Sequence, residues 1–435
     1  MRLVLGSAAC ALAAAFLAGS GGARHVVQLP AGTVELHTEI AVAAGTELRG
    51  APSGTALHAA PDFAGRALIV VQGNNIVLRD FTVDGNRGAL EARTGLPPSD
   101  TPFARFTHGN GILAIGVDRL TISGIRFREM AGFAILVSQS HSVAIDRVEV
   151  ADSGSRNPGG RNNATGGILL EEGTSDFQVT RCGLRRIRGN GIWTHSLYTS
   201  PRNRQGVIFG NRFAEIGRDA IQVGHAIALR VEENSGERIG FPPEVVDIEN
   251  QAIPAALDTA GNVERSAYLA NRFQETDGKC MDLDGFHDGE IRGNTCINRG
   301  PAAAYPFGNY AIVMNNSNPD MRSENIRLLE NLVDGANLGG IFVIGTGHRI
   351  AHNRLLHLNA AHCDTCIYLA AEPDMLRSGI YLGRGAEHPA PARGNVIEDN
   401  QITGYKMSTR CIALAPGIGP SWNTIRANQC EDDSY

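Results

Sequence analysis

The amino-acid sequence predicts an all-β fold, a single-stranded right-handed parallel β-helix of about a dozen coils. Three observations lead to this prediction. A short apolar motif recurs at a spacing of about 23 residues, an asparagine recurs at one turn of the repeat, and Gly, at 52 of 435 residues, divides the chain into short segments. No long segment has the 3.6-residue apolar period of a helix. Repeats of this length bury a face only against their neighbours, as stacked coils do.

The first motif is a small residue, then Ile or Met, any residue, and usually another apolar residue. Apolar residues two positions apart lie on the same face of a strand, so we expect them to fill the interior of each coil. Copies begin at Gly111, Ala134, Gly167, Gly191, Ala220, Cys280, Ala311, Gly340, Gly379 and Cys411. The wider spacings indicate loop insertions near 94–107, 152–165, 196–205, 225–265, 300–309, 360–378 and 384–394.

The second motif places a polar residue between apolar residues at a repeated turn. Copies are centred on Asp146, Asn211, Asn271, Asn294, Asn331, Asn353, Asn400 and Asn428. Asn tolerates left-handed backbone geometry, and its amide can bond to the same turn of the next coil. A ladder of this kind favours a β-helix about 55–60 Å long over a propeller, whose repeat is about twice as long, or a leucine-rich horseshoe.

The chain begins with a segment typical of export. Arg2 precedes an apolar run from Leu3 to Ala18, and small residues follow it. This pattern predicts a signal peptide over 1–23 and a secreted or periplasmic protein, with a membrane anchor or a buried first helix as the alternative. Residues 24–435 would then form a single β-helix domain.

Export to an oxidising compartment would allow disulfides. Two stretches repeat the same pattern, in which one Cys opens an apolar strand and a second Cys follows an Asn turn. They predict the bridges Cys280–Cys296 and Cys411–Cys430. A local Cys363–Cys366 bridge would leave Cys182 unpaired, although sequence alone leaves the connectivity open.

Composition excludes several classes of protein. With 43% hydrophobic residues the chain is not disordered, and a formal net charge of −6 argues against nucleic acid or an anionic membrane as the main partner. We expect a polysaccharide or oligosaccharide as the partner and no membrane span after removal of the leader. The sequence does not determine the oligomeric state.

Residues that alternate with the inward positions of the first motif must point outward. They predict two columns of outward-facing residues along the stacked strands. At both ends these columns contain mainly apolar residues or residues without a reactive side chain. The middle collects Glu171, Trp193, His195, Gln222, Asp282 and Asp284, and adjacent turns add Glu172, His225, Lys279 and His287. Insertions flank the same strands, so we expect loops to wall a groove along this face.

The sharpest feature is Asp282-Leu-Asp284. Carboxylates at i and i+2 of one strand emerge from the same face about 6.5–7 Å apart, and crowding would raise the pKa of one of them. This arrangement suits a general acid beside a general base, near the range of inverting glycosidases. A solvated surface or a calcium site is the alternative, although the spacing completes no calcium loop.

We predict Asp282, Asp284 and His195 as catalytic residues. Those expected to bind substrate are Glu171, Trp193, Gln222, His225, Lys279 and His287. Glu171 is expected three coils, or about 14 Å, from Asp284. We predict no metal site: the cluster of His348, His352, His357 and His362 with Cys363 and Cys366 invites zinc, but its spacing is irregular and a disulfide is the commoner arrangement.

The start of the chain resembles the pectate-lyase and polygalacturonase superfamily. The resemblance lies in Leu29-Pro-Ala-Gly32-Thr-Val-Glu-Leu, Leu48-Arg-Gly50, Gly54-Thr55 and Phe81-Thr-Val-Asp84-Gly85-Asn86. It implies the same right-handed β-helix, a fold whose members often act on extracellular polysaccharides. The characteristic motifs of polygalacturonases are absent; only Asp282-Leu-Asp284 and Gly224-His225 come near them.

Three functions remain open. The first is an exported glycoside hydrolase that needs no cofactor, with the two aspartates as acid and base, His195 tuning or relaying a proton, and Trp193 stacking on a sugar. The second is a polysaccharide lyase, with Ca²⁺ or Arg218 and Lys279 neutralising a uronate. The third is a glycan-binding or surface protein without catalysis.

Overall fold

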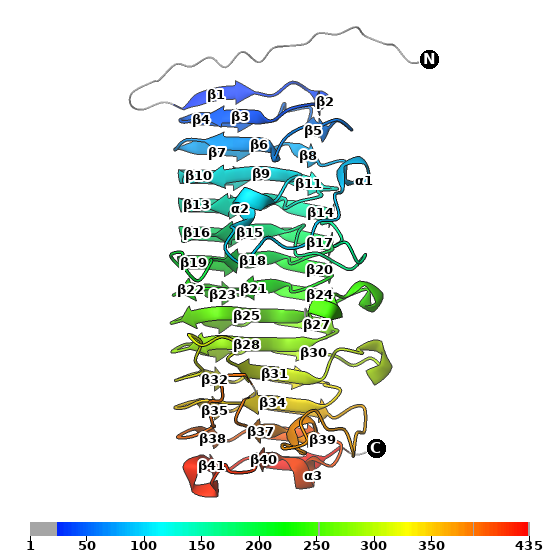
Figure 1. The fold of residues 1–435 in the computed structure, drawn as a ribbon, viewed down its shortest axis with the longest axis vertical. Helices are drawn as coiled ribbons and strands as arrows, with labels where there is room; N and C mark the ends of the chain where they lie inside the picture. The colour runs from blue at the N-terminus through cyan, green and yellow to red at the C-terminus, as the bar shows by residue number, and fades with distance from the viewer. Residues whose placement is uncertain (1–23, 251–252, 386, 434–435) are drawn as a thin grey trace.

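The computed structural model describes residues 24–250, 253–385 and 387–433, and these form the predicted right-handed parallel β-helix (Figure 1). Each coil contributes three strands, which pair in parallel with the strands of the coils before and after it. The predicted signal peptide, 1–23, lies outside the described residues. No helix within the described ranges is long and apolar enough to cross a membrane.

The strands form three stacks along the rod. Stack 1 contains β3 (Ile40–Ala43), β6 (Ala67–Gln72), β9 (Asn110–Ile115), β12 (Ile135–Ser138), β15 (Ile168–Glu171), β18 (Ile192–His195), β21 (Ile221–Val223), β25 (Ala255–Glu264), β28 (Lys279–His287), β31 (Tyr310–Asn315), β34 (Gly339–Val343), β37 (Ile380–Leu382) and β40 (Ile412–Leu414).

Stack 2 follows stack 1 in each coil. It contains β1 (His25–Gln28), β4 (Thr46–Arg49), β7 (Ile76–Arg79), β10 (Asp118–Ser123), β13 (His141–Asp146), β16 (Ser175–Thr180), β19 (Asn203–Phe209), β22 (Ala226–Ile227), β23 (Arg230–Glu232), β26 (Ala267–Leu269), β29 (Glu290–Arg292), β32 (Arg327–Leu329), β35 (Arg349–Ala351), β38 (Val396–Glu398) and β41 (Thr424–Arg426).

Stack 3 closes the coil. It contains β2 (Gly32–Leu36), β5 (Thr55–Ala59), β8 (Thr82–Asp84), β11 (Arg126–Arg128), β14 (Glu149–Ser153), β17 (Gly183–Ile187), β20 (Arg212–Ile216), β24 (Ser235–Ile239), β27 (Arg272–Thr276), β30 (Thr295–Ile297), β33 (Leu332–Asp334), β36 (Arg354–Leu358), β39 (Gln401–Gly404) and β42 (Gln429–Asp432).

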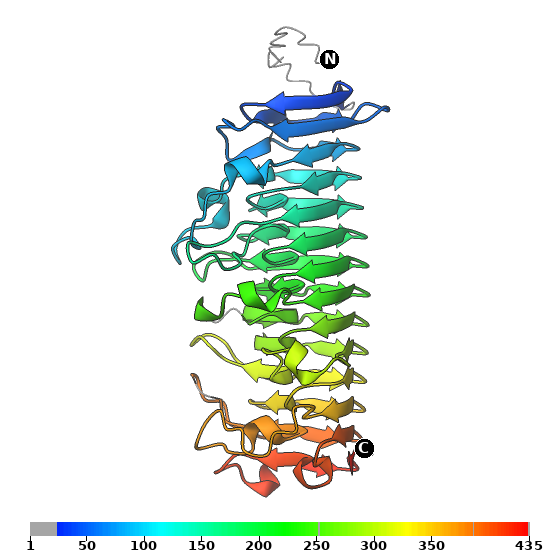
Figure 2. The same ribbon diagram turned by 90° about the vertical axis from the view of Figure 1, so that its right-hand side faces the viewer.

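Helices are few and short. They are α1 (Arg87–Leu90), α2 (Phe103–Phe106), α3 (Met407–Arg410) and the 3₁₀ turns η1 (Pro243–Val245), η2 (Ile248–Asn250), η3 (Ala302–Ala304), η4 (Met375–Arg377) and η5 (Pro420–Trp422). Most of them lie in the long loops, which project from one side of the rod, while short turns line the opposite side (Figure 2).

The inward positions of the first motif fill the coil as predicted. Ile112, Ile135, Ile168 and Ile192 are paired from strand to strand and buried in one continuous core. Stacking buries these branched side chains against the next coil, and burial of each contributes about 1.5–3 kcal/mol. The repeat is therefore held together mainly by apolar contacts between neighbouring coils.

The asparagine ladder runs between stacks 2 and 3. Each Asn donates from Nδ2 to the Oδ1 of the next Asn, as in the 2.9 Å bond from Asn211 to Asn234 and the 2.8 Å bond from Asn271 to Asn294. The left-handed backbone, however, falls on the residue before each Asn, for example Glu330 with φ 58° and His352 with φ 57°. Asn is needed here for its amide and not for its backbone freedom.

The predicted bridges Cys280–Cys296, Cys363–Cys366 and Cys411–Cys430 are present, and Cys182 is a buried free thiol. The bridge at Cys363–Cys366 removes both thiolates of the zinc alternative. Both ring nitrogens of His348 already have hydrogen-bond partners. Ile326 N donates to its Nδ1, and its Nε2 bonds to the carbonyl of Ile344 at 2.7 Å.

Candidate active site on stack 1

The strand pairing of stack 1 confirms the predicted first outward column and adds one position to it. The residues paired in succession are Leu113, Leu136, Leu169, Trp193, Gln222, Asp258, Asp282, Val313, Phe342 and Tyr381. Sequence reasoning missed Asp258. A signal was present, because Ala256-Leu257-Asp258-Thr259 follows the first motif with Leu in place of Ile.

The segment 225–265, expected to be a single insertion, instead contains β22, β23, β24 and the whole of β25. It supplies a full coil between Gln222 and Asp282. The expected spacing of three coils between Glu171 and Asp284 is therefore wrong. The two residues are four coils apart, about 19 Å at 4.8 Å per coil.

The N-terminal end of this outward face is covered. Helix α2, in the loop 94–107, places Phe103 against Trp193 with ring centroids 4.9 Å apart in an edge-to-face contact. Leu113, Leu136 and Leu169 are buried in the same small apolar cluster, and Trp193 is only 8% exposed. The stacking role predicted for Trp193 does not fit this packing.

Glu171 holds that covering helix in place. Its two carboxyl oxygens accept backbone N–H groups at the start of α2, from Phe103 at 2.9 Å and Ala104 at 2.7 Å. Burial raises the pKa of Glu171 to about 7, and the Glu172 carboxylate adds to the rise. The side chain is fully buried, so it contacts the loop and is not free to meet a sugar.

His195 lies beside the same cluster. Its ring is 5.2 Å from Trp193 and 5.5 Å from Phe103. Burial, with a smaller contribution from His225, lowers the pKa of His195 to about 4, so the imidazole is neutral. Three coils, about 14 Å, separate His195 from Asp284, so the two side chains are not within hydrogen-bond reach of each other.

Glu171, Glu172 and His195 have donor atoms within 4.8 Å of one another, which is a spacing that a metal ion can use. Both oxygens of Glu171 already accept amides, and Glu172 Oε1 accepts the N–H of Leu197 at 2.9 Å. The two carboxylates therefore accept backbone N–H groups of the loops 94–107 and 196–205 and hold these loops in place.

The open part of the face begins at Gln222. Its amide bridges two coils, because Nε2 donates to Asp258 Oδ2 at 2.6 Å and Oε1 accepts from Asn190 at 2.7 Å. Asp219, just before β21, accepts the N–H of Ala255 at 2.8 Å. Asp219, Asp258 and Asp282 thus gather carboxylates from three consecutive coils.

The two central aspartates have different partners. Asp258 and Asp282 are directly paired on β25 and β28, and Lys279 Nζ bonds to Asp282 Oδ2. Burial, together with the Asp219 and Asp282 carboxylates, raises the pKa of Asp258 well above its usual range. Burial likewise raises the pKa of Asp219 to about 6. Asp282 Oδ1 is buried and has no hydrogen-bond partner among the described residues.

Asp284 is the outward residue two positions after Asp282. Ser317 N–H donates to its Oδ1 at 2.8 Å, and the Ser317 hydroxyl bonds to its Oδ2. Burial raises the pKa of Asp284, against these two bonds. Both of its oxygens are held by the loop after β31, whereas Asp282 keeps one oxygen without a hydrogen-bond partner among the described residues.

Tyr198, in the loop 196–205, was also missed. Its ring lies 4.1 Å from His225 in an edge-to-face contact. Partial burial raises the pKa of Tyr198 to about 12, and the Asp320 and Asp284 carboxylates add to the rise. The side chain is 54% exposed. His225 itself is buried, and burial lowers its pKa. The aromatic ring available beside the aspartates is therefore Tyr198.

His287 does not belong to this site. It sits where β28 turns from stack 1 towards stack 2, paired with Glu264. Its Nδ1 bonds to Asp288 at 2.8 Å and its Nε2 to Asn262 at 2.9 Å, and the side chain is fully buried. Both ring nitrogens are already bonded, so the packing gives no support to the predicted substrate-binding role of His287.

The C-terminal end of the column is closed as well. Phe342 and Tyr381 point outward in register, yet both are buried, and the loop 360–378 packs η4 against β34. The part of stack 1 that neither cover reaches is therefore limited to the coils of Gln222, Asp258, Asp282 and Val313. Gln222, Asp282 and Val313 are partly exposed there, whereas Asp258 is buried. This strip contains Lys279 and lies beside Arg218, whose charge acts on Asp219.

No known family model matches the sequence, and no curated protein matches it. Solved structures match in fold. The catalytic domain of a GH87 alpha-1,3-glucanase, determined with tetrasaccharides, is 13% identical with a TM-score of 0.57, over 92% of this chain and 64% of that one. The Dettilon tailspike protein is 14% identical with a TM-score of 0.54, over 92% and 63%. The chain is thus a right-handed parallel β-helix protein, the fold implied by its resemblance to pectate lyases and polygalacturonases.

Proposed function

We propose that the protein is a secreted glycoside hydrolase that cleaves a polysaccharide on the open strip of stack 1. The observation that carries this proposal is the asymmetry of two adjacent aspartates. Asp258 holds its proton above the usual range, and Asp282 is bonded to a lysine. One carboxylic acid beside one carboxylate is the pair that glycosidic cleavage requires.

Each residue then has a chemical role. Asp258 donates its proton to the leaving glycosidic oxygen, and Asp282 acts as the base or nucleophile. Lys279 stabilises the negative charge of Asp282 through the ion pair. Gln222 orients Asp258 through the hydrogen bond from its Nε2, and the Asp219 carboxylate helps to keep Asp258 protonated. Tyr198 offers an exposed ring to the apolar face of a sugar.

Two further observations support a carbohydrate substrate and export. The GH87 domain of similar fold belongs to an alpha-1,3-glucanase, and its structure was determined in complex with tetrasaccharides. Three disulfides suit an oxidising compartment, in line with the leader predicted over 1–23.

A lyase is the second candidate, because Arg218 Nε is buried without a hydrogen-bond partner among the described residues. A guanidinium beside Lys279 would neutralise a uronate before its C5 proton is removed. Elimination leaves a product that absorbs near-ultraviolet light, whereas hydrolysis leaves saturated ends. Binding without turnover would instead support a glycan-binding protein.

The test is to incubate the protein with a panel of neutral and acidic polysaccharides, with and without chelator, and to weigh the products. Asp258→Asn and Asp282→Asn should each lower kcat by about 10²–10⁴. The control is Asp288→Asn, an exposed position outside the strip. Full activity of either aspartate variant refutes the assignment.

A further inference from the structure

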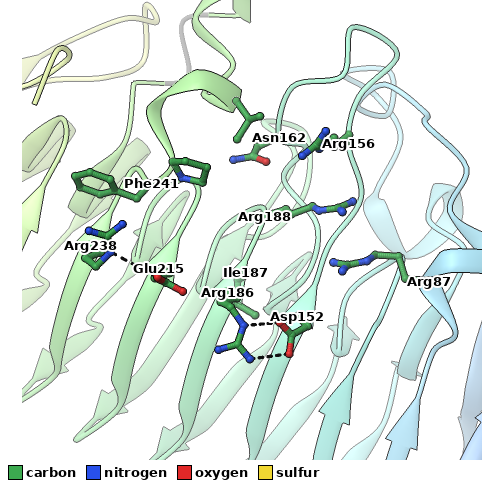
Figure 3. Close-up of a pocket in the computed structure, with 12 residues that line it drawn as sticks. Arg87, Asp152, Arg156, Asn162, Arg186, Ile187, Arg188, Glu215, Arg238 and Phe241 are labelled. Carbon is green, nitrogen blue, oxygen red and sulfur yellow. Dashed lines mark hydrogen bonds and ion pairs between the residues drawn. The ribbon is translucent and has the colours of Figure 1, made fainter. Parts of the chain in front are cut away.

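A second candidate site lies away from the aspartates, over stack 3. A cavity of about 380 Å³ opens between the ends of β14, β17, β20 and β24, beneath the loop segments around Asn162 and Phe241 (Figure 3). Its volume falls within the range of small-molecule sites. Neither Asp258 nor Asp282 lines it.

Arginines dominate the lining. Arg87 extends from α1, Arg156 from the loop 154–166, Arg186 and Arg188 from β17 and the residue after it, and Arg238 from β24 (Figure 3). Clustering cations in a concave, partly buried space is unfavourable unless anions neutralise them. The protein as a whole has a net charge of −6, so this local concentration of positive charge is not a general property of its surface.

Resident carboxylates neutralise only part of the cluster. Asp152 pairs with Arg186 at 2.8 Å, Glu91 with Arg188 at 2.8 Å, and Glu129 with Arg87 at 3.0 Å. Glu215 approaches Arg238 at 3.5 Å. Each of these four arginines therefore has one acidic partner.

Arg156 has none. Its Nε is buried and lacks a hydrogen-bond partner among the described residues, and the guanidinium faces the space between Asn162 and Arg188 (Figure 3). A buried donor without an acceptor is unfavourable, and more so when it is charged. An anion in the cavity would accept from Arg156. Burial and the nearby Arg188 charge lower the pKa of Arg87. An anion in the cavity would also reduce this repulsion between the two arginines.

The remaining wall is apolar. Ile187, Phe241, Pro242 and Val245 line the same cavity, and the Arg238 guanidinium stacks on the Phe241 ring at 4.6 Å. A bare inorganic ion would leave this wall uncovered. A sugar that bears an acidic group presents both an anion and an apolar C–H face.

A neighbouring cavity extends the surface. It measures about 450 Å³ and uses the same strands, with Arg185 next to Arg186 on β17 and Glu237 next to Arg238 on β24. Arg212 on β20 and Arg272 on β27 also line it. Within the described part of the chain, eight arginines and four acidic residues line the two cavities.

We propose that this surface binds an acidic oligosaccharide, with the carboxylate or sulfate of one sugar held by Arg156, Arg188 and Arg87. The sugar identity rests on the proposed function, whereas the anion site rests on the arginines alone. The two cavities would let successive acidic sugars follow stack 3 from β17 towards β27.

The loops over the cavity make this a separate site from stack 1. Asn162 N–H donates to the carbonyl of Val245 at 2.8 Å, which joins the two loops over β17 and β24. Asn163 donates to the carbonyl of Thr94 at 2.8 Å, and so ties the same loop to the segment that carries α2. These loops stand between the arginine cavity and the covered end of stack 1.

The test is calorimetric titration of the full chain carrying Asp258→Asn, so that cleavage does not consume the ligand. Trigalacturonate supplies a carboxylate, a sulfated trisaccharide supplies a sulfate ester, and maltotriose is the neutral control. We expect both acidic sugars to bind and their affinity to fall as salt is raised. Adding Arg156→Gln should weaken that binding at least about tenfold.

Arg354→Gln is the matched control, because Arg354 lies on β36 of the same stack and outside both cavities. It should leave affinity unchanged. Within the described ranges of the chain, the Arg156 side chain makes no hydrogen bond that Arg156→Gln would remove. Equal affinity with and without Arg156, or equally tight binding of maltotriose, overturns the proposal.

Sodium sulfate and sodium phosphate separate a sugar site from a plain anion site. If these ions bind and the acidic sugars do not, the saccharide assignment is wrong. Cleavage of polysaccharides by the wild-type protein is measured in a separate experiment. Binding that depends on Arg156 in a protein that cleaves no polysaccharide would refute the hydrolase and leave this site standing.

Discussion

Asp258 and Asp282 occupy directly paired positions on β25 and β28, and Lys279 is bonded to only one of them. Stacking brings two like carboxylates within one strand spacing, about 4.8 Å, where both cannot easily be charged. The two carboxylates therefore differ in their surroundings. Asp282 has the ion pair with Lys279, while burial and the Asp219 and Asp282 carboxylates raise the pKa of Asp258.

The first prediction concerns the alkaline limb of the pH profile. Asp258 must be protonated to act as the acid, so activity should fall as pH rises through its raised pKa. The Asp219 carboxylate contributes to that rise. Asp219→Asn should lower the pKa of Asp258 and move the alkaline limb of kcat/KM to lower pH. An unchanged limb would exclude Asp258 as the acid; the acidic limb is the internal control.

The second prediction concerns substrate contact by Tyr198. Removing an exposed ring that packs on a sugar should raise KM about two- to tenfold and leave kcat largely unchanged. Tyr198→Ala tests this, and Tyr198→Phe should retain most of the affinity. Tyr368→Ala, an even more exposed tyrosine in the loop 360–378, is the control. A large fall in kcat with no change in KM would contradict the stacking role.

The third prediction concerns stability against pH. The pKa of Glu171 is about 7 when folded and near 4.5 when unfolded, so the unfolded state loses this proton first. Stability should therefore fall as pH rises from 4.5 to 7, by about 3 kcal/mol from this group. Glu171→Gln should make the fall smaller in urea titrations. Glu35→Gln, at an exposed position of β2, should retain the wild-type slope.

The fourth prediction concerns the asparagine ladder. Asn294 is buried, donates from Nδ2 to Asn331 Oδ1 at 2.9 Å, and accepts from Asn271. Asn294→Ala removes the oxygen that accepts the buried N–H of Asn271, together with the two amide bonds, and should cost about 1–3 kcal/mol in chemical denaturation. Asn428→Ala, at the exposed end of the ladder, should cost less. Equal costs at both positions would show that the amide bonds contribute little.

Much of the fold was predictable because it is local and repeated. The first motif placed the inward residues and one outward column, and the paired Cys patterns correctly predicted Cys280–Cys296 and Cys411–Cys430. Asp258 was missed because Leu257 replaces the usual Ile. That single substitution concealed a coil and shifted the spacing of every residue across it.

The candidate site was less predictable because loops decide which outward residues meet solvent. Trp193 and Tyr381 point outward as expected, yet α2 and the loop 360–378 bury them. The sequence by itself determined the coil, its interior and the acidic centre of one face, since strand alternation needs no distant information. Only the tertiary structure decided which outward carboxylates are buried, which of them pairs with a lysine, and where arginines from separate coils and loops converge. Burial and charge depend on segments far apart in the chain.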